Sequence, residues 1–180
     1  MKLQERYTKE VIPRMKDIFG FTNYLEVPQL KKVVVNTGIG KFQENKDLVE
    51  FIERSMAAIT GQKSVRTHAK KAIAGFKIRE GSFVGLRVTL RGRKMYDFLE
   101  RFLFVALPRS RDFRGIDTKC IDPSGNMTIG IKEHIIFPEI IQEDLKTIFG
   151  LEVTITTNAK TKKEAEAFFR LMGFPLKRES

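Results

Sequence analysis

A period-two alternation in residues 84–91 constrains the fold of this chain more than any other feature. Apolar side chains alternate there with small, polar or basic residues, in the order Val84, Gly85, Leu86, Arg87, Val88, Thr89, Leu90 and Arg91. This period is typical of a β-strand that buries one face. The other face would present Arg87, Thr89 and Arg91 with about 7 Å between successive side chains. The pattern therefore predicts a sheet with one apolar face and one polar, basic face.

The same strand belongs to the most basic stretch of the chain, residues 62–94. That stretch carries +9 of the formal net charge of +11. Its basic residues are Lys63, Arg66, Lys70, Lys71, Lys77, Arg79, Arg87, Arg91, Arg93 and Lys94, and its acid is Glu80. Clustered lysine and arginine displace counterions from phosphates, and we expect Gly75, Gly81 and Gly85 to break regular structure and let the backbone approach a ligand closely. The stretch indicates a nucleic-acid interface; a solvated strand face without a ligand is the alternative interpretation.

Length and composition favour one globular domain over residues 1–180. The chain is 42% apolar and 31% charged, and its pI near 9.8 indicates an acidic polymer as the partner. No apolar run approaches the roughly 20 residues that span a bilayer, so we expect no membrane crossing. The N-terminus lacks the apolar core of a signal peptide, which predicts a cytoplasmic protein. Cys120 is the single cysteine, which excludes an intramolecular disulfide and a cysteine zinc site.

Helical and strand periodicities alternate along the chain and predict the α+β class, with a mainly antiparallel sheet and helices packed on one of its faces. Apolar spacing predicts an N-terminal helix within residues 1–20, kinked or split by Pro13 and with Ile18 on its buried side. Further helices are predicted over 48–59 with an Asn45 or Asp47 cap, over 95–103 with a stop at Pro108, near Glu143, and from a capping box at 161–164. Strands are predicted over 30–37, 84–90, 127–131 and 151–157.

Two irregular stretches are predicted to lie at the surface. Residues 73–82 would form a projecting basic loop, and residues 108–125 an irregular surface segment. The aspartates of the second stretch, Asp112, Asp117 and Asp122, lack the one-residue alternation of a calcium loop, so we expect them to cap turns or pair with arginines rather than bind metal. Gly38 to Lys41 completes neither a dinucleotide fingerprint nor a Walker loop, which favours a plain glycine turn.

No constellation of residues for catalysis is found. His68 and His134 are the only histidines and lie in no zinc-type motif, and no serine occupies a nucleophile elbow. His68 could hydrogen-bond a phosphate, whereas His134 is predicted to be a structural histidine with its hydrogen bonds satisfied. We therefore expect no enzyme, no cofactor and no metal. A general RNA-binding module is one candidate function, suggested by REGSFV at residues 79–84, although Glu80 interrupts the RNP1 pattern.

Six long motifs give the chain a resemblance to a known family. They are VPQLKKVVVNTGIG (27–40), TGQKSVRTHAKKAIAGFKIREG (60–81), GLRVTLRG (85–92), LPRSRDFRG (107–115), GNMTIGIKEHIIFPEI (125–140) and TTNAKTKKEAEAFFRLMGFP (156–175). With these motifs the chain resembles bacterial large-ribosomal-subunit protein five, the 5S-rRNA-binding family, from about Tyr7 to Leu176. It departs from commoner members at residues 83–84 and 140–142, which are more aliphatic here.

The resemblance implies that one face of the sheet receives 5S rRNA. It assigns polar rRNA contacts to Asn36, Gln62 and Thr89, and the charge pattern adds a set of basic residues around them, namely Lys63, Arg66, Arg87 and Arg91. Polar groups of this kind can read RNA edges and 2′-hydroxyls while the cations hold phosphates.

The resemblance also implies contacts beyond 5S rRNA. Within the projecting loop, the residues expected to touch P-site tRNA are Ala74, Gly75, Phe76, Lys77, Ile78, Arg79, Glu80 and Gly81. The family lies in the central protuberance of the large subunit with 23S rRNA and other 5S-associated proteins. A contact with a small-subunit protein across the intersubunit bridge is expected from residues 108–125.

Overall fold

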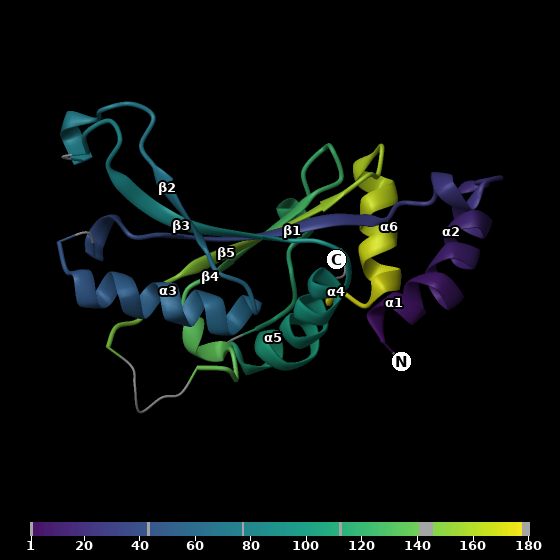
Figure 1. Cartoon of the computed structure of the whole chain (residues 1–180). Coiled ribbons are helices and arrows are strands. Elements are labelled where there is room, and N and C mark those ends of the chain that lie inside the picture. The colour runs from purple at the N-terminus through teal and green to yellow at the C-terminus, as the bar shows by residue number, and fades with distance from the viewer. Residues whose placement is uncertain (1, 43, 77, 112, 141–145, 178–180) are drawn as a thin grey trace. The chain divides into compact units, whose positions relative to one another are not determined.

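A computed structural model describes residues 2–42, 44–76, 78–111, 113–140 and 146–177, which contain one antiparallel sheet and several helices (Figure 1). The strands are β1 (Leu30–Gly38), β2 (Val65–His68), β3 (Phe83–Leu90), β4 (Met127–Ile131) and β5 (Leu151–Thr157), in the spatial order β2-β3-β1-β5-β4. This confirms the predicted α+β class and the four predicted strands. Only β2 was not predicted.

The chain forms two compact units. The first unit consists of Met1–Val33, Leu90–Ile129 and Thr154–Ser180, and the second unit of Val34–Thr89 and Gly130–Val153. The single domain expected over residues 1–180 stays a prediction.

The strands bury alternate side chains. On β3, Leu86, Val88 and Leu90 are buried whereas Arg87 is exposed. The alternation predicted for this strand is therefore confirmed. Gly85 differs from expectation, because it is buried inside β3 instead of breaking regular structure.

The helices of the first unit lie in three segments of the chain. The N-terminal helix comprises α1 (Leu3–Arg6), a π-helical turn (Tyr7–Val11) and α2 (Ile12–Phe19). The next comprises α4 (Gly92–Arg101), a π-helical turn (Phe102–Ala106) and α5 (Leu107–Arg109), and the last is α6 (Lys162–Met172). Figure 1 shows α1 and α2 beside α6, and the Tyr7 ring meets the Phe168 ring edge-on with centroids 6.2 Å apart.

Each helical proline follows a π-helical turn. The Ile12 N–H donates to the Tyr7 carbonyl before Pro13, and the Leu107 N–H donates to the Phe102 carbonyl before Pro108. Proline has no N–H, and its ring crowds the carbonyl four residues back, so a wider turn lets the helix continue through it. Pro13 therefore lies in the first turn of a new α-helical segment, α2, which confirms the predicted split of the helix. The predicted stop at Pro108 is wrong, because the helix ends after Arg109 instead.

Ile18 does not face the core. Its side chain is 59% exposed, while Val11 and Met15 are fully buried and Phe19 is half-buried. The buried row thus steps by four residues along α2, which leaves Ile18 outside it, and the prediction for Ile18 is wrong. Gly20 ends the helix as expected, with φ +70°.

Side-chain caps fix the ends of two helices. In the second unit, α3 (Lys46–Thr60) begins where the Asn45 Oδ1 accepts hydrogen bonds from the N–H groups of Asp47 and Leu48, at 3.1 and 3.2 Å. This confirms Asn45 as the cap. In the first unit, the Thr161 Oγ1 accepts from the Glu164 N–H at 3.3 Å, as in the predicted capping box. The Glu164 carboxylate reaches the Lys160 N–H at 3.0 Å, one residue earlier than that box requires.

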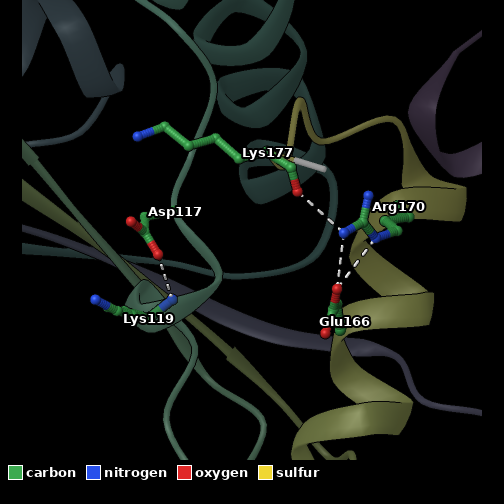
Figure 2. Close-up of polar contacts among 5 residues, drawn as sticks. All are labelled: Asp117, Lys119, Glu166, Arg170 and Lys177. Atoms are coloured by element: carbon green, nitrogen blue, oxygen red, sulfur yellow. Dashed lines mark hydrogen bonds and ion pairs between the residues drawn. The ribbon is translucent and has the colours of Figure 1, made fainter. Parts of the chain in front are cut away.

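The segment at residues 108–125 is tied to the C-terminal segment of the first unit. The Ile116 N–H donates to the Pro175 carbonyl at 2.7 Å, and the Lys177 N–H donates to the Ile116 carbonyl at 2.9 Å. Arg170 donates to the Lys177 carbonyl at 3.1 Å and pairs with Glu166 at 2.8 Å (Figure 2). These bonds anchor a stretch that the sequence predicted only as irregular.

Two aspartates of this segment cap turns, as expected. The Asp117 carboxylate accepts from the Lys119 N–H at 2.9 Å (Figure 2), and this hydrogen bond, with the charges of Lys177 and Lys119, holds the pKa of Asp117 below its usual value. Asp122 accepts from the Asn126 N–H at 2.8 Å. Asp112 lies outside the described residues, as does the helix predicted near Glu143.

Two kinds of feature are absent from the described part of the chain. Among residues 2–42, 44–76, 78–111, 113–140 and 146–177, no cluster of histidine, cysteine, aspartate or glutamate could hold a metal ion. No helix within these ranges has the length and apolar character needed to cross a membrane.

His134 is a core residue of the second unit, as predicted, but the prediction that its hydrogen bonds are satisfied is wrong. It is fully buried and stacks on Phe149, with ring centroids 3.9 Å apart. Its Nδ1 accepts from the Phe149 N–H at 3.4 Å, which makes Nε2 the protonated nitrogen of the neutral ring, and Nε2 has no hydrogen-bond partner among the described residues. Burial lowers the pKa of His134 to about 4.

This burial predicts acid sensitivity. The folded-state pKa of His134, about 4, is below the ordinary value of 6.5, so the unfolded chain binds the proton more tightly. His134 should therefore lower the free energy of unfolding as the pH falls from 6.5 towards 4, by up to about 1.4 kcal/mol per pH unit. Urea unfolding of wild type and His134→Asn at several pH values measures this slope. Equal slopes for both proteins would contradict it, and His68→Asn, which removes an exposed histidine, is the matched control.

Candidate nucleic-acid interface

The polar face of β1 and β3 brings three predicted RNA contacts together in the second unit. Asn36 lies half-buried on β1, and Arg87 and Thr89 lie on the neighbouring β3. Their sequence neighbours Thr37 and Val88 are buried on the opposite face, so alternation turns the three predicted contacts away from the core. The arrangement combines an amide, a hydroxyl and a guanidinium on one surface.

Gln62 is held beside Thr89. Its Nε2 donates to the Thr89 carbonyl at 3.3 Å, and its own backbone carbonyl accepts from the Thr60 Oγ1 at 3.0 Å. These bonds fix the segment that follows α3, where Lys63 is exposed. The structure therefore places Gln62 beside Thr89, and their role as rRNA contacts stays a prediction.

Arg66 lies on the other side of the sheet from Arg87. In the antiparallel pairing of β2 and β3, Val65 is opposite Arg87 and Arg66 is opposite the buried Leu86. Directly paired residues share a face, so Arg66 points to the side of α3. There its Nε lies 2.6 Å from the Glu53 carboxylate, and its guanidinium lies 5.1 Å from the Phe83 ring centroid.

The two arginines also differ in their charge partners. The hydrogen bond and charge of Glu53 raise the pKa of Arg66 and occupy its guanidinium. Arg87 is exposed and forms no ion pair with any residue that the structure describes. A phosphate can therefore approach Arg87 without displacing a carboxylate, whereas at Arg66 it would compete with Glu53. Arg91, in the first unit, is exposed at the N-cap position of α4.

The connection between β2 and β3 projects from the strands of its own unit, as Figure 1 shows. It is closed by an isolated bridge between Ile73 and Ile78 and by a hydrogen bond from the Ala69 N–H to the Ser82 carbonyl at 2.8 Å. A short 3-10 turn, Ala74–Phe76, forms part of its tip. Lys77 lies outside the described residues; Gly75, Arg79, Glu80 and Gly81 are exposed and Ile78 is half-buried.

An exposed aromatic side chain marks this loop. Phe76 is 74% exposed and lines, with Phe42, Lys41 and Ile148, a hollow of about 700 Å³. Exposed aromatic rings beside lysines are suited to stacking on unpaired bases.

Two residues of the polar face were missed from the sequence. Glu152 of β5 accepts a hydrogen bond from the Asn36 Nδ2 at 3.2 Å, and Lys132 lies exposed just after β4. Along β5, Leu151 and Val153 are buried and Glu152 between them is exposed on the other face of the strand. The alternation of residues 151–157 could therefore have predicted that Glu152 lies on the polar face. Its position next to Asn36 depends on strand order, which periodicity does not specify.

Comparison with known proteins gives a consistent result over almost the whole chain. Residues 23–79 match the model of the family described as Ribosomal protein L5, and residues 83–176 match the model of the C-terminus of that ribosomal family. Large ribosomal subunit protein uL5 of Halothermothrix orenii is 49% identical over 173 residues, 96% of this chain and 97% of that protein. The uL5 protein of Kosmotoga olearia is 49% identical over 176 residues, 98% of this chain and 96% of its own length.

The fold and the matches define a ribosomal protein, a structural component of a ribonucleoprotein rather than an enzyme. The chain belongs to the ribosomal protein L5 family of the large ribosomal subunit. It therefore functions in translation, in the ribosome in the cytoplasm.

Gly85 is required at the base of this interface. A Cβ at position 85 would lie 2.8 Å from the Thr37 carbonyl oxygen and 3.0 Å from the Thr67 Oγ1. Gly85→Ala should therefore destabilise the fold by about 1–3 kcal/mol, because a backbone atom must move. Gly130→Ala is the matched control, since a Cβ there meets no atom within 4 Å. Chemical denaturation measures both, and equal stability of the two variants would contradict the register of β1 and β3.

Proposed function

We propose that this chain binds 5S rRNA through the polar face of β1 and β3 and helps to attach it in the central protuberance of the large subunit. The observation that carries this proposal is the grouping of Asn36, Gln62, Arg87 and Thr89 in one unit. Membership in the ribosomal protein L5 family supports RNA as the partner.

The chemistry of this face fits a structured RNA. Arg87 is an exposed cation for a phosphate, while the Asn36 amide and the Thr89 hydroxyl can bond base edges or 2′-hydroxyl groups. Lys63 adds a second exposed cation close to Gln62 in the chain. Phosphate contacts hold the RNA in place, and the neutral polar groups give selectivity.

We also propose that the loop at residues 73–82 contacts P-site tRNA, a second RNA ligand of the protein. The exposed Phe76 can stack on a base or ribose, and Arg79 supplies a cation. The segment at residues 108–125 would meet a small-subunit protein, and the buried anchors Ile116 and Ile121 would hold that segment in place. Neighbouring 5S-associated proteins and 23S rRNA complete the expected surroundings.

Single substitutions test the 5S rRNA face. Arg87→Ala should weaken 5S rRNA binding and lower the slope of log affinity against log salt by about 0.7–0.9, because one phosphate contact is lost. Asn36→Ala should weaken binding without changing that slope, since it removes an uncharged contact. Fluorescence anisotropy at several salt concentrations measures both quantities.

A charge-matched control separates this site from general electrostatics. Arg54→Ala removes the same charge from α3, where the side chain is 82% exposed and pairs with Glu50. It should leave 5S rRNA affinity close to wild type. If Arg87→Ala and Asn36→Ala both bind 5S rRNA with wild-type affinity, the choice of this face is wrong. If Arg54→Ala loses as much affinity as Arg87→Ala, the effect of Arg87 is nonspecific electrostatic attraction.

The tRNA contact makes a separate prediction. Phe76→Ala should speed the dissociation of P-site tRNA from reconstituted ribosomes by severalfold, because base stacking on an aromatic ring contributes about 1–3 kcal/mol. It should leave 5S rRNA affinity unchanged. Phe104→Ala removes another exposed phenylalanine, in the first unit, and serves as the control. Unchanged tRNA dissociation in Phe76→Ala would contradict a stacking role.

A further inference from the structure

A hollow of about 410 Å³ lies on the second unit beside Asn36. Three strands that are neighbours in the sheet, β1, β5 and β4, contribute to it. The lining residues that matter here are Asn36, Gly38, Gly130, Lys132, Gly150 and Glu152. Of these residues, the family resemblance implied an RNA contact for Asn36 alone, and it assigned no ligand to the hollow as a whole.

Glycines keep the hollow open. A Cβ at Gly38 or Gly130 would meet no atom within 4 Å, so neither glycine is required by packing. The strands are tied at this point, because the Thr37 Oγ1 donates to the Gly150 carbonyl at 2.6 Å. Gly38, Gly130 and Gly150 thus contribute bare backbone to the lining, which a flat ligand can approach closely.

Glu152 determines which group Asn36 offers to a ligand. An ionised carboxylate only accepts hydrogen bonds, so the Asn36 atom that lies 3.2 Å from the Glu152 Oε2 must be the donating Nδ2. The Asn36 Oδ1 is therefore the remaining acceptor of the amide, and no described residue donates to it. Asn36 and Glu152 together present acceptors at the wall of the hollow.

The charges that line the hollow disfavour the binding of a phosphate group next to Asn36 and Glu152. The Glu152 carboxylate repels an anion, while the exposed Lys132, which has no ion pair among the described residues, attracts one at the edge. The ligand that fits carries adjacent N–H donors at one end and a phosphate at the other. A nucleotide with an unpaired base has this form.

Among the four bases, guanine matches the acceptors best. Its Watson–Crick edge offers N1–H and the N2 amino group side by side, which the two oxygens of a carboxylate can accept together. Adenine and cytosine place an acceptor beside their amino group, and uracil flanks its single N–H with two carbonyls. We propose that this hollow binds an unpaired guanine nucleotide of RNA, with the base edge on Glu152 and Asn36 and the phosphate at Lys132. This inference rests on the proposed function, because the polar face must meet RNA.

Nuclear magnetic resonance of the full-length, ¹⁵N-labelled chain tests the site directly. The probes are guanosine, adenosine, cytidine and uridine 5′-monophosphates, and the readout is the backbone amide shifts of Gly38, Gly130 and Gly150. Of the four nucleotides, only guanosine monophosphate should shift these amide signals in a saturable manner. Glu152→Ala should raise its dissociation constant at least about tenfold, in line with the discrimination of one good base contact.

The variant Glu152→Gln distinguishes two roles of Glu152, which are accepting hydrogen bonds from the base and orienting the Asn36 amide. A glutamine at position 152 can still accept from the Asn36 Nδ2, but one of its two terminal atoms is a donor that opposes guanine. It should therefore bind guanosine monophosphate as weakly as Glu152→Ala. Glu50→Gln makes the same chemical change on α3 and should bind like wild type.

Three results would overturn the inference. They are equal shifts with all four nucleotides, no saturable shift at these glycines, and wild-type binding by Glu152→Gln. Any of them, with Arg87→Ala still weakening 5S rRNA binding, would leave the proposed function intact. Loss of 5S rRNA selectivity in the wild-type chain would instead overturn the proposed function.

Discussion

The burial of one face of β1 and β3 is the constraint on which the interface depends. Val33, Val35, Leu86 and Val88 are each at most 1% exposed, and their burial holds the strands in register. A slip of one residue would turn every polar side chain of a strand into the core. The apolar core and the polar face are thus two consequences of one alternation. Gly85 lets β3 approach the Thr37 carbonyl closely, because any Cβ at that position would lie 2.8 Å from its oxygen.

Charge alone does not identify the contacts within the basic stretch. Arg66 and Arg87 are both exposed arginines, yet one is paired with Glu53 and the other has no ionic partner among the described residues. On the polar face, the acid Glu152 bonds to Asn36 and orients its amide. Selectivity in this account comes from neutral groups and one acid placed among cations, whereas the cations supply attraction that any RNA would share.

Sequence periodicity predicted most of the helices and strands, but it did not predict which strands pair. The strands over 30–37 and 84–90 and the Asn45 cap depend on residues close together in the chain, so local pattern specified them. The stop at Pro108 was wrong because a π-helical turn accommodates the proline, which residue type does not reveal. The side of Arg66 and the bond from Asn36 to Glu152 depend on register and strand order, which are set by contacts distant in the chain. The candidate RNA contacts themselves stay predictions.

The most direct measurement is the affinity of the wild-type chain for 5S rRNA and for an unrelated structured RNA of equal length, over a range of salt concentrations. The electrostatic contribution to affinity falls steeply for both RNAs as the salt concentration rises, whereas the contribution of hydrogen bonds from neutral groups does not fall in this way. We expect a preference for 5S rRNA that persists when salt has weakened the electrostatic attraction common to both RNAs. Equal affinities that decline in parallel would contradict it and would leave a basic surface without selectivity.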